Sequence, residues 1–332
     1  CKKFNKLFIN NKKNIEILII GEFNLLEKRM DKNIFNFYKF IKDNSNYNLI
    51  FIDRYTENFI INSSIFDVIK QFCISKNPII LSLVYDNPDN SLVSDLELYN
   101  YIKIFDIEDC YNIEGLTNVI KKYKYTHVFY KYNCIQQRYI INSFPEIKFI
   151  HFSHYIDNKI FDINNTITKD IDVLLYGNTS SFYPFRNRLL EILSNNSLFN
   201  FKYLLFPGFG DSEKCKYEPI IGKELSNYIN KSKITICTCS MFNYLVKKYF
   251  EISLSGSVLC GNFPNTEENI YGENIIILDE NWDDNTILNY INDHLKDNEK
   301  LKKNRENAYK ISQNYTYQKG LEKFNNIIKN II

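Results

Sequence analysis

Two lysines and a glutamate stand close together in the sequence, where they could bind a phosphorylated ligand. Lys247 and Lys248 precede Glu251 in the run SMFNYLVKKYFEISLSGSVLCGNFP, residues 240–264. Lysines at a helix N-terminus attract anions, and a carboxylate can accept hydrogen bonds from two adjacent hydroxyls, such as those of a ribose. A Ser-Gly-Ser turn follows at 255–257 and would let backbone approach a ligand closely. Together these features indicate a nucleoside-diphosphate ligand.

Glu251 is the strongest single candidate because it lies in the otherwise apolar sequence FEISL. A carboxylate is costly to bury unpaired, so a ligand or a lysine must satisfy it. Lys248 and Tyr244 precede Glu251 by three and seven residues, and a helix would place all three on one face. Core packing is the alternative role for Tyr244, and a solvated helix face is the alternative for the lysines.

A second phosphate-binding candidate lies between a predicted strand and a predicted helix, at Gly177, Asn178 and Thr179. Free N–H groups in such a turn can hold a phosphate, although the same residues also suit an ordinary tight turn. Arg186, near the start of the following helix, either reaches the diphosphate or is a solvated charge.

Possible acid–base groups follow predicted strands in the first half of the chain. His154 lies beyond the strand in IKFIHFSHYID, where an imidazole can donate to a hydroxyl or act as a general base. A satisfied surface histidine is the alternative. Glu22 follows the first predicted strand and Asp86 the third, so either carboxylate could also serve as a base.

Predicted strands and helices alternate along the chain, which favours parallel sheets. In the first half, we expect strands at residues 14–21, 47–53, 78–85, 126–130 and 147–152, and helices at 31–42, 65–74 and 115–123. In the second half, we expect strands at 172–176, 201–206, 233–237, 258–260 and 275–278, and helices at 185–193, 222–230, 244–254, 286–296, 299–312 and 317–332. The two series predict an α/β protein of two doubly wound, Rossmann-like domains with a boundary at 161–169.

Ligands of open α/β sheets bind beyond the carboxyl ends of the strands. Two such domains that face each other form a cleft with two ligand-binding walls, which is the geometry of a group-transfer enzyme. Asp170 and Asp172 form a D-x-D-like pair, but they lead into a strand and so belong at the end of the sheet away from the cleft. We therefore expect no metal site.

The composition narrows the class of protein further. The chain has 332 residues, of which 45% are hydrophobic and 24% charged, and a formal net charge of +2. These values are typical of a globular protein and give no field that would attract nucleic acid. The eight cysteines lack metal-ligand spacing, and no apolar run is long enough to cross a membrane. We expect a cytoplasmic protein, and its first residue, Cys1 rather than Met, predicts a piece of a longer one.

The sequence KKYFEISLSGSVL at residues 247–259 resembles the donor-sugar segment of group 1 glycosyltransferases of the GT-B fold, especially the branch related to spore-maturation proteins. The resemblance covers about half the chain and includes DIDVLLYGNTSSFYPFRNRLLEIL, KELSNYINKSKITIC and ENAYKISQNYTYQKGLEKF. Many such enzymes carry a second glutamate eight positions before the first. That position is Asn243 here, and an amide cannot supply the same charge to a sugar hydroxyl.

The resemblance implies a GT-B-like fold with an acceptor domain at 1–165, a donor domain at 166–316 and a final helix, 317–332, that returns to the first domain. It implies a UDP- or GDP-sugar as co-substrate, no other cofactor and a glycan or glycoprotein acceptor. The implied donor-binding residues are Gly177, Asn178, Thr179, Arg186, Ile221, Tyr244, Lys247, Lys248, Glu251, Ser255, Gly256 and Ser257. The implied catalytic residues are Glu251 and, by a loose match to a P-H-S-x-D-like turn, His154 and Asp157.

Two alternatives remain at this stage. One is a non-catalytic module of the same shape that binds a glycan or a partner enzyme, which Asn243 favours. The other is an epimerase that modifies a sugar nucleotide.

Overall fold

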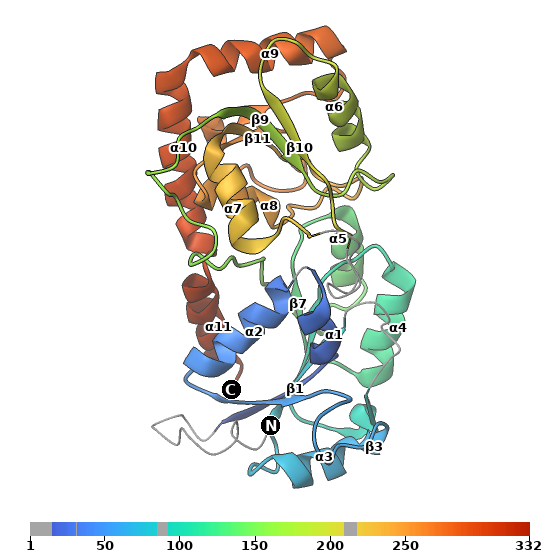
Figure 1. Ribbon diagram of the computed structural model, residues 1–332. Coiled ribbons are helices and arrows are strands. Elements are labelled where there is room, and N and C mark those ends of the chain that lie inside the picture. The colour runs from blue at the N-terminus through green and yellow to red at the C-terminus, as the bar shows by residue number, and fades with distance from the viewer. Residues whose placement is uncertain (1–14, 31, 85–91, 209–217) are drawn as a thin grey trace.

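Two parallel β-sheets, each packed between helices, form the core of this protein, whose computed structural model describes residues 15–30, 32–84, 92–208 and 218–332. They belong to two α/β bodies that lie one above the other in Figure 1. We call the part that carries the sheet of residues 16–151 the first body, and the part that carries the sheet of residues 171–277 the second body. Asp86 lies outside the described residues.

The first body is built on six parallel strands in the order β2-β1-β4-β6-β7-β8. Every residue of the interior strand β1 is buried, as expected of a parallel strand that is covered on both faces. The strands are β1 (Glu16–Ile20), β2 (Asn48–Ile52), β4 (Ile79–Val84), β6 (Lys103–Ile107), β7 (His127–Tyr130) and β8 (Lys148–His151). The helices are α1 (Phe23–Lys28), α2 (Asn33–Asn44), α3 (Ile65–Phe72), α4 (Ile113–Tyr123) and α5 (Ile135–Asn142), with a short helix η1 (Leu96–Leu98) and a small pair of strands, β3 (Ser63–Ser64) and β5 (Val93–Ser94).

The second body is built on five parallel strands in the order β10-β9-β11-β12-β13. The strands are β9 (Ile171–Tyr176), β10 (Phe201–Leu204), β11 (Ser232–Ile236), β12 (Val258–Gly261) and β13 (Ile276–Ile277). The helices are α6 (Pro184–Ser194), α7 (Gly222–Lys231), α8 (Lys248–Leu254), α9 (Asp284–Lys296), α10 (Asn298–Ser312) and the short η3 (Gly272–Asn274) and η4 (Gln313–Tyr315). The strand order reverses between β9 and β11, which makes their carboxyl ends the expected ligand site.

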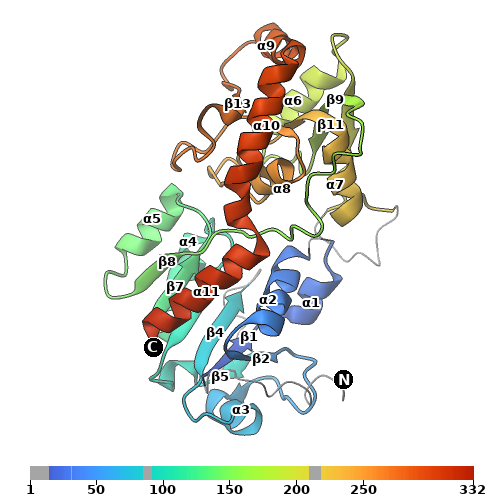
Figure 2. The same ribbon diagram turned by 90° about the vertical axis from the view of Figure 1, so that its left-hand side faces the viewer.

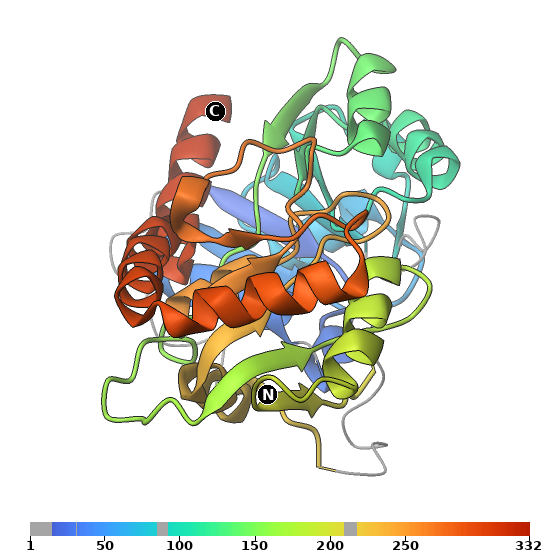
Figure 3. The same ribbon diagram turned by 90° about the horizontal axis from the view of Figure 1, so that it is seen from above.

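The last helix, α11 (Tyr317–Ile331), returns from the second body to the first. Figure 2 shows α10 running down from the second body and α11 continuing across the first. Phe324 and Ile328 of α11 are buried in the same apolar cluster as Phe152 of the first body, and the Tyr317 hydroxyl donates to the Asn33 carbonyl oxygen over 3.1 Å. The predicted crossing helix is confirmed. Seen from above, α9 lies across the end of the second body that faces away from the first (Figure 3).

Most predicted elements are present within a few residues of their expected bounds, but three differences affect the site. Strand β6 and helix α5 were not predicted. The helix expected at 244–254 begins only at Lys248, and residues 244–247 before it are not helical. The predicted boundary at 161–169 lies in the connection between β8 and β9.

Among the described residues, no helix is both long and apolar enough to cross a membrane. The six described cysteines are free thiols, and all except Cys73 are buried. Cys1 and Cys215 lie outside the described residues.

Candidate functional site

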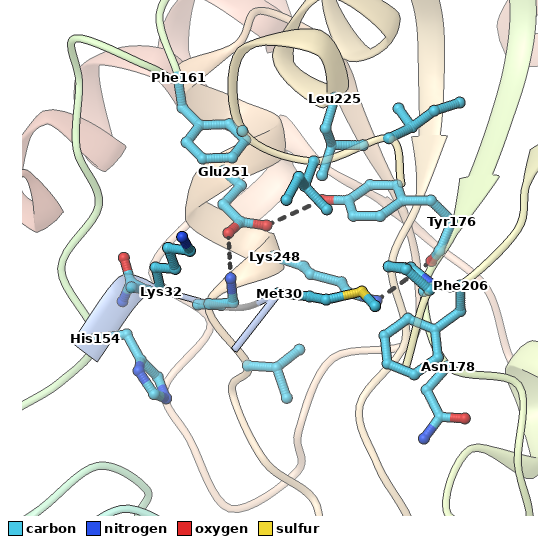
Figure 4. A pocket seen from close by; sticks show the side chains of 18 of the residues that line it. Met30, Lys32, His154, Phe161, Tyr176, Asn178, Phe206, Leu225, Lys248 and Glu251 are labelled. Carbon is cyan, nitrogen blue, oxygen red and sulfur yellow. Dashed lines mark hydrogen bonds and ion pairs between the residues drawn. The ribbon is translucent and has the colours of Figure 1, made fainter. Parts of the chain in front are cut away.

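A cavity of about 330 Å³ lies where the two bodies face each other, beyond the carboxyl ends of their strands. The first body contributes Glu108, Asp109, Tyr132, His154 and Asp157 to its lining, together with Met30, Lys32, Asn33 and Asn36. The second body contributes a polar group, Gly177, Asn178, Arg186, Lys247, Lys248 and Glu251, and an apolar group, Phe206, Pro207, Ile220, Ile221 and Leu225. Figure 4 shows Glu251 and Lys248 in this cavity, with His154 on another side of it.

The two walls are joined at one edge by direct contacts. Glu267 of the second body accepts from both the backbone N–H and the side-chain amide of Asn133, over 2.7 and 2.8 Å. The rings of Tyr132 and Tyr244 stack across the interface with centroids 4.1 Å apart. These contacts fix the two walls relative to each other.

Glu251 is 2% exposed, and protein groups already satisfy part of its carboxylate. It accepts from Lys247 Nζ over 2.7 Å and from the Tyr176 hydroxyl over 3.3 Å. Burial and the charge of Glu251 together raise the pKa of Tyr176, so this hydroxyl stays protonated and donates. A carboxylate has about four acceptor positions, and Glu251 therefore retains capacity for the hydroxyls of a ligand.

Lys248 extends from the first turn of α8 to the end of β9, where it meets Gly177. Its Nζ donates to the Tyr176 carbonyl oxygen over 3.3 Å. A Cβ at position 177 would lie 1.5 Å from that Nζ, and Gly177 has a φ of 102°. Glycine is therefore required both for the left-handed backbone and for the space that the ammonium group occupies.

Arg186 is the second basic group of the site, and unlike the partly buried Lys248 it is only 1% exposed. Its guanidinium donates to the carbonyl oxygens of Asn178 and Thr238 over 2.9 and 2.8 Å, and it packs on the Tyr183 ring at 3.9 Å. Its Nε has no hydrogen-bond partner among the described residues. Neither Arg186 nor Lys248 forms an ion pair within the described part of the chain. A buried guanidinium and a partly buried ammonium group that form no ion pair with the described carboxylates are suited to an anionic ligand.

We expect ligand binding at this site to be coupled to proton uptake. Burial, assisted by the nearby charge of Arg186, lowers the pKa of Lys248 well below its usual value, whereas a bound diphosphate would raise it again. Affinity should therefore be highest at low pH and should fall as the pH rises from the ligand-free pKa toward that of the complex.

Calorimetric titration with a nucleoside-diphosphate sugar, in two buffers of different ionisation enthalpy, measures this proton uptake. The uptake should disappear in the Lys248→Met variant. Uptake of the same size in that variant would assign the proton to another group.

The remaining donor-site predictions have mixed outcomes. Asn178, Ile221 and Tyr244 line the cavity, and the Tyr244 hydroxyl accepts from the backbone N–H of Cys110 over 3.2 Å. Thr179 is partly buried but is not part of the lining.

The turn at Ser255, Gly256 and Ser257 lies outside the cavity, and the expectation that it approaches the ligand is wrong for this structure. The turn precedes β12 and therefore lies at the amino end of the sheet, opposite the site. Ser255 Oγ is 3.1 Å from Ser226 Oγ, and Ser257 Oγ is 2.7 Å from Thr235 Oγ1. The Gly256 position faces Ile163, which a Cβ would approach to 2.8 Å. The small residues permit packing inside the second body.

His154 is buried at the end of the first sheet and belongs to a hydrogen-bonded group. Its Nε2 is 2.8 Å from the Tyr132 hydroxyl, and its Nδ1 is 3.6 Å from Glu108 Oε1. Asp157 also lines the cavity, and its Oδ1 accepts from the backbone N–H of Lys159 over 2.9 Å. Glu108 and the Tyr132 hydroxyl therefore orient the imidazole from its two nitrogens.

Two carboxylates considered from the sequence lie elsewhere. Glu22 does not line the cavity and instead forms an ion pair with Arg54. Asp172 lies at the amino end of β9, away from the cavity as expected, and pairs with Lys233 Nζ over 2.7 Å. Within the described residues, no group of three histidine, cysteine or acidic side chains could hold a metal ion.

No protein-family model matches the chain, and a comparison with curated proteins finds no relative. Solved structures do match along nearly the whole chain. Sucrose-phosphate synthase from Thermosynechococcus elongatus has a TM-score of 0.65 and 9% identity, over 96% of this chain and 99% of that one. A glycosyltransferase from Rickettsia africae has a TM-score of 0.59 and 14% identity, over 96% and 98%. Anabaena HepE, in complex with UDP and glucose, has a TM-score of 0.57 and 10% identity, over 95% and 100%. The fold is therefore that of GT-B glycosyltransferases.

Proposed function

We propose that this protein is a glycosyltransferase that moves a sugar from a nucleoside-diphosphate sugar to an acceptor hydroxyl without a metal ion. The observation that carries the proposal is the pair of basic groups at the point where the strand order of the second body reverses, the partly buried Lys248 and the buried Arg186. A diphosphate would supply the anion that these groups lack. The GT-B fold, and the UDP and glucose in the Anabaena HepE structure, support a nucleotide sugar as its source.

The lining of the second body offers a place for each part of such a donor. The apolar residues Phe206, Ile221 and Leu225 suit a nucleobase, and Glu251 suits the ribose hydroxyls. Lys248, Arg186 and the start of α8 suit the diphosphate. The donor sugar would then lie toward the first body, near His154.

The reaction breaks the bond between the sugar's anomeric carbon and the diphosphate oxygen, and forms a bond from that carbon to the acceptor oxygen. Negative charge develops on the departing diphosphate, where Lys248 and Arg186 are already in place to stabilise it. The acceptor hydroxyl loses its proton, either to His154 or to the departing phosphate. Holding both substrates in one enclosed site supplies the proximity that the transfer needs.

The assay that tests this function measures nucleoside-diphosphate release from UDP- and GDP-sugars with and without added carbohydrate acceptors. We expect release from at least one donor, accelerated by an acceptor and reduced in the Lys248→Met variant. A non-catalytic glycan-binding module is the second candidate, because Asn243 stands where many such enzymes carry a second glutamate. Nucleotide binding with no release under any condition would favour that module.

We expect the transfer to continue in the presence of a strong chelator. Metal-dependent transferases hold a cation on the diphosphate with acidic ligands, whereas two protein cations provide the charge here. The release assay with and without EDTA checks this prediction. Complete loss of activity that magnesium or manganese restores would show that a metal ion compensates the diphosphate charge.

A further inference from the structure

Aromatic side chains form an exposed group at the edge of the cavity, and both bodies contribute to it. We call Tyr111, Phe182 and Phe242 the aromatic rim. Phe242 has ring centroids 6.2 Å from Tyr111 and 6.0 Å from Phe182. Tyr111 is 55% exposed and Phe182 is 49% exposed, and the adjacent Met241 is 58% exposed. Isolated exposed aromatics are common, but a contiguous group of them marks a binding surface.

The aromatic rim is continuous with the cavity. Phe242 lies 5.6 Å from Tyr244, whose ring stacks on Tyr132 at 4.1 Å. Tyr132 in turn lies 5.3 Å from His154, measured between ring centroids. A line of rings therefore leads from the acid–base group of the first body to the protein surface.

The chemistry of this line of rings selects among possible occupants. A sugar ring has a face of C–H groups that packs on an aromatic ring and a periphery of hydroxyls that need hydrogen bonds. The charged side chains that line the cavity nearest to Tyr111 in the sequence are Glu108 and Asp109, which accept from hydroxyls and repel anions. A neutral carbohydrate can both pack on the rings and donate hydrogen bonds to the carboxylates. The carboxylates would repel an anionic polymer, and an alkyl chain has no hydroxyls to donate to them.

We propose that the aromatic rim binds the acceptor, and that the acceptor is a neutral oligosaccharide. Its terminal sugar would enter the cavity near His154, and the following sugars would stack on Phe242, Tyr111 and Phe182. The inference rests on the proposed function, because it assigns the acceptor side of that same reaction.

The test is an equilibrium titration of the protein, saturated with a nucleoside diphosphate, with neutral oligosaccharides of increasing length from several glycan types. For at least one type we expect affinity to rise by roughly fivefold for each added sugar that stacks on a ring. Tyr111→Ala and Phe182→Ala should each abolish the gain in affinity from about one added sugar. The matched controls Tyr139→Ala and Phe66→Ala change side chains that are 60% and 47% exposed elsewhere in the first body, and they should keep the full length dependence.

The outcomes separate this inference from the proposed function. Failure to bind any nucleoside diphosphate overturns the proposed function itself. Nucleotide binding without tighter binding of longer glycans, or with a length dependence that the rim variants leave unchanged, overturns only the inference. Preferential binding of alkyl glycosides or anionic glycans also overturns it, because the rim would then recognise a different chemistry. Unchanged nucleotide affinity in the two rim variants is the expected sign that they are folded.

Discussion

Lys248→Met is expected to lower the affinity for a nucleoside diphosphate by roughly 10- to 100-fold. The magnitude is that of one lost hydrogen bond between charged groups, about 1.5–3 kcal/mol. The same variant should unfold at a higher temperature than wild type when no ligand is present, because methionine replaces a desolvated amino group that has no ion-pair partner among the described residues. Calorimetric titration and thermal unfolding measure the two effects.

The matched control for this prediction is Lys296→Met. Lys296 lies on α9 with its side chain 66% exposed, and its loss should change neither quantity appreciably. Wild-type nucleotide affinity in Lys248→Met would remove Lys248 from the donor site. A loss of affinity together with lower stability would indicate that Lys248 acts mainly in the fold.

Glu251→Gln is expected to lower donor affinity by about 10-fold or more. The substitution keeps the size of the side chain but removes its charge and replaces one acceptor by a donor, so that it can no longer accept from both ribose hydroxyls. If Glu251 binds the ribose, the 2′-deoxy analogue of the donor should lose much less affinity in the variant than in wild type. Titration of both ligands against both proteins forms a thermodynamic cycle.

Lys247→Met is the control for the internal partner of Glu251. It removes the ammonium group that lies 2.7 Å from Oε1 and leaves the carboxylate in place. In Lys247→Met, the discrimination against the 2′-deoxy analogue should persist. If the affinity lost through Glu251→Gln and the affinity lost through removal of the 2′-hydroxyl simply add, Glu251 does not contact the ribose. It would then be a structural partner of Lys247.

Much of the second-body wall of the cavity could be predicted from the sequence because its signals are local. Lys248 and Glu251 lie within one helical turn of each other, and Gly177 and Arg186 flank a single strand-to-helix connection. Such residues keep their relation in any fold that contains the same strand and helix.

Part of the first-body wall could not be predicted, although His154 and Asp157 were, because strand β6 carries charged residues and does not resemble a buried strand. Its sequence is KIFDI, with Lys103 and Asp106 inside the strand. Both side chains are buried. Their charges have partners, because Lys103 donates to the Leu96 carbonyl oxygen and Asp106 pairs with Lys131 at 2.8 Å. These partners come from other elements, so nothing near the strand in the sequence reveals that the charges are satisfied. Glu108 and Asp109 follow this strand and were missed with it.

The prediction that the Ser255–Gly256–Ser257 turn approaches the ligand was wrong for a different reason. A turn of small residues permits close approach by a ligand or by other parts of the protein, and the sequence alone does not distinguish them. The position of the turn before β12 decides between these possibilities, because ligands bind at the opposite end of a parallel sheet.

The most direct test of the proposed donor site is an experimentally determined structure of the protein with a bound nucleoside diphosphate. We predict that the diphosphate lies within hydrogen-bond distance of Lys248 Nζ and beside Gly177, with the ribose on Glu251 and the base against Ile221. A nucleotide bound outside this cavity, or a cavity that stays empty at saturating nucleotide, would contradict the account.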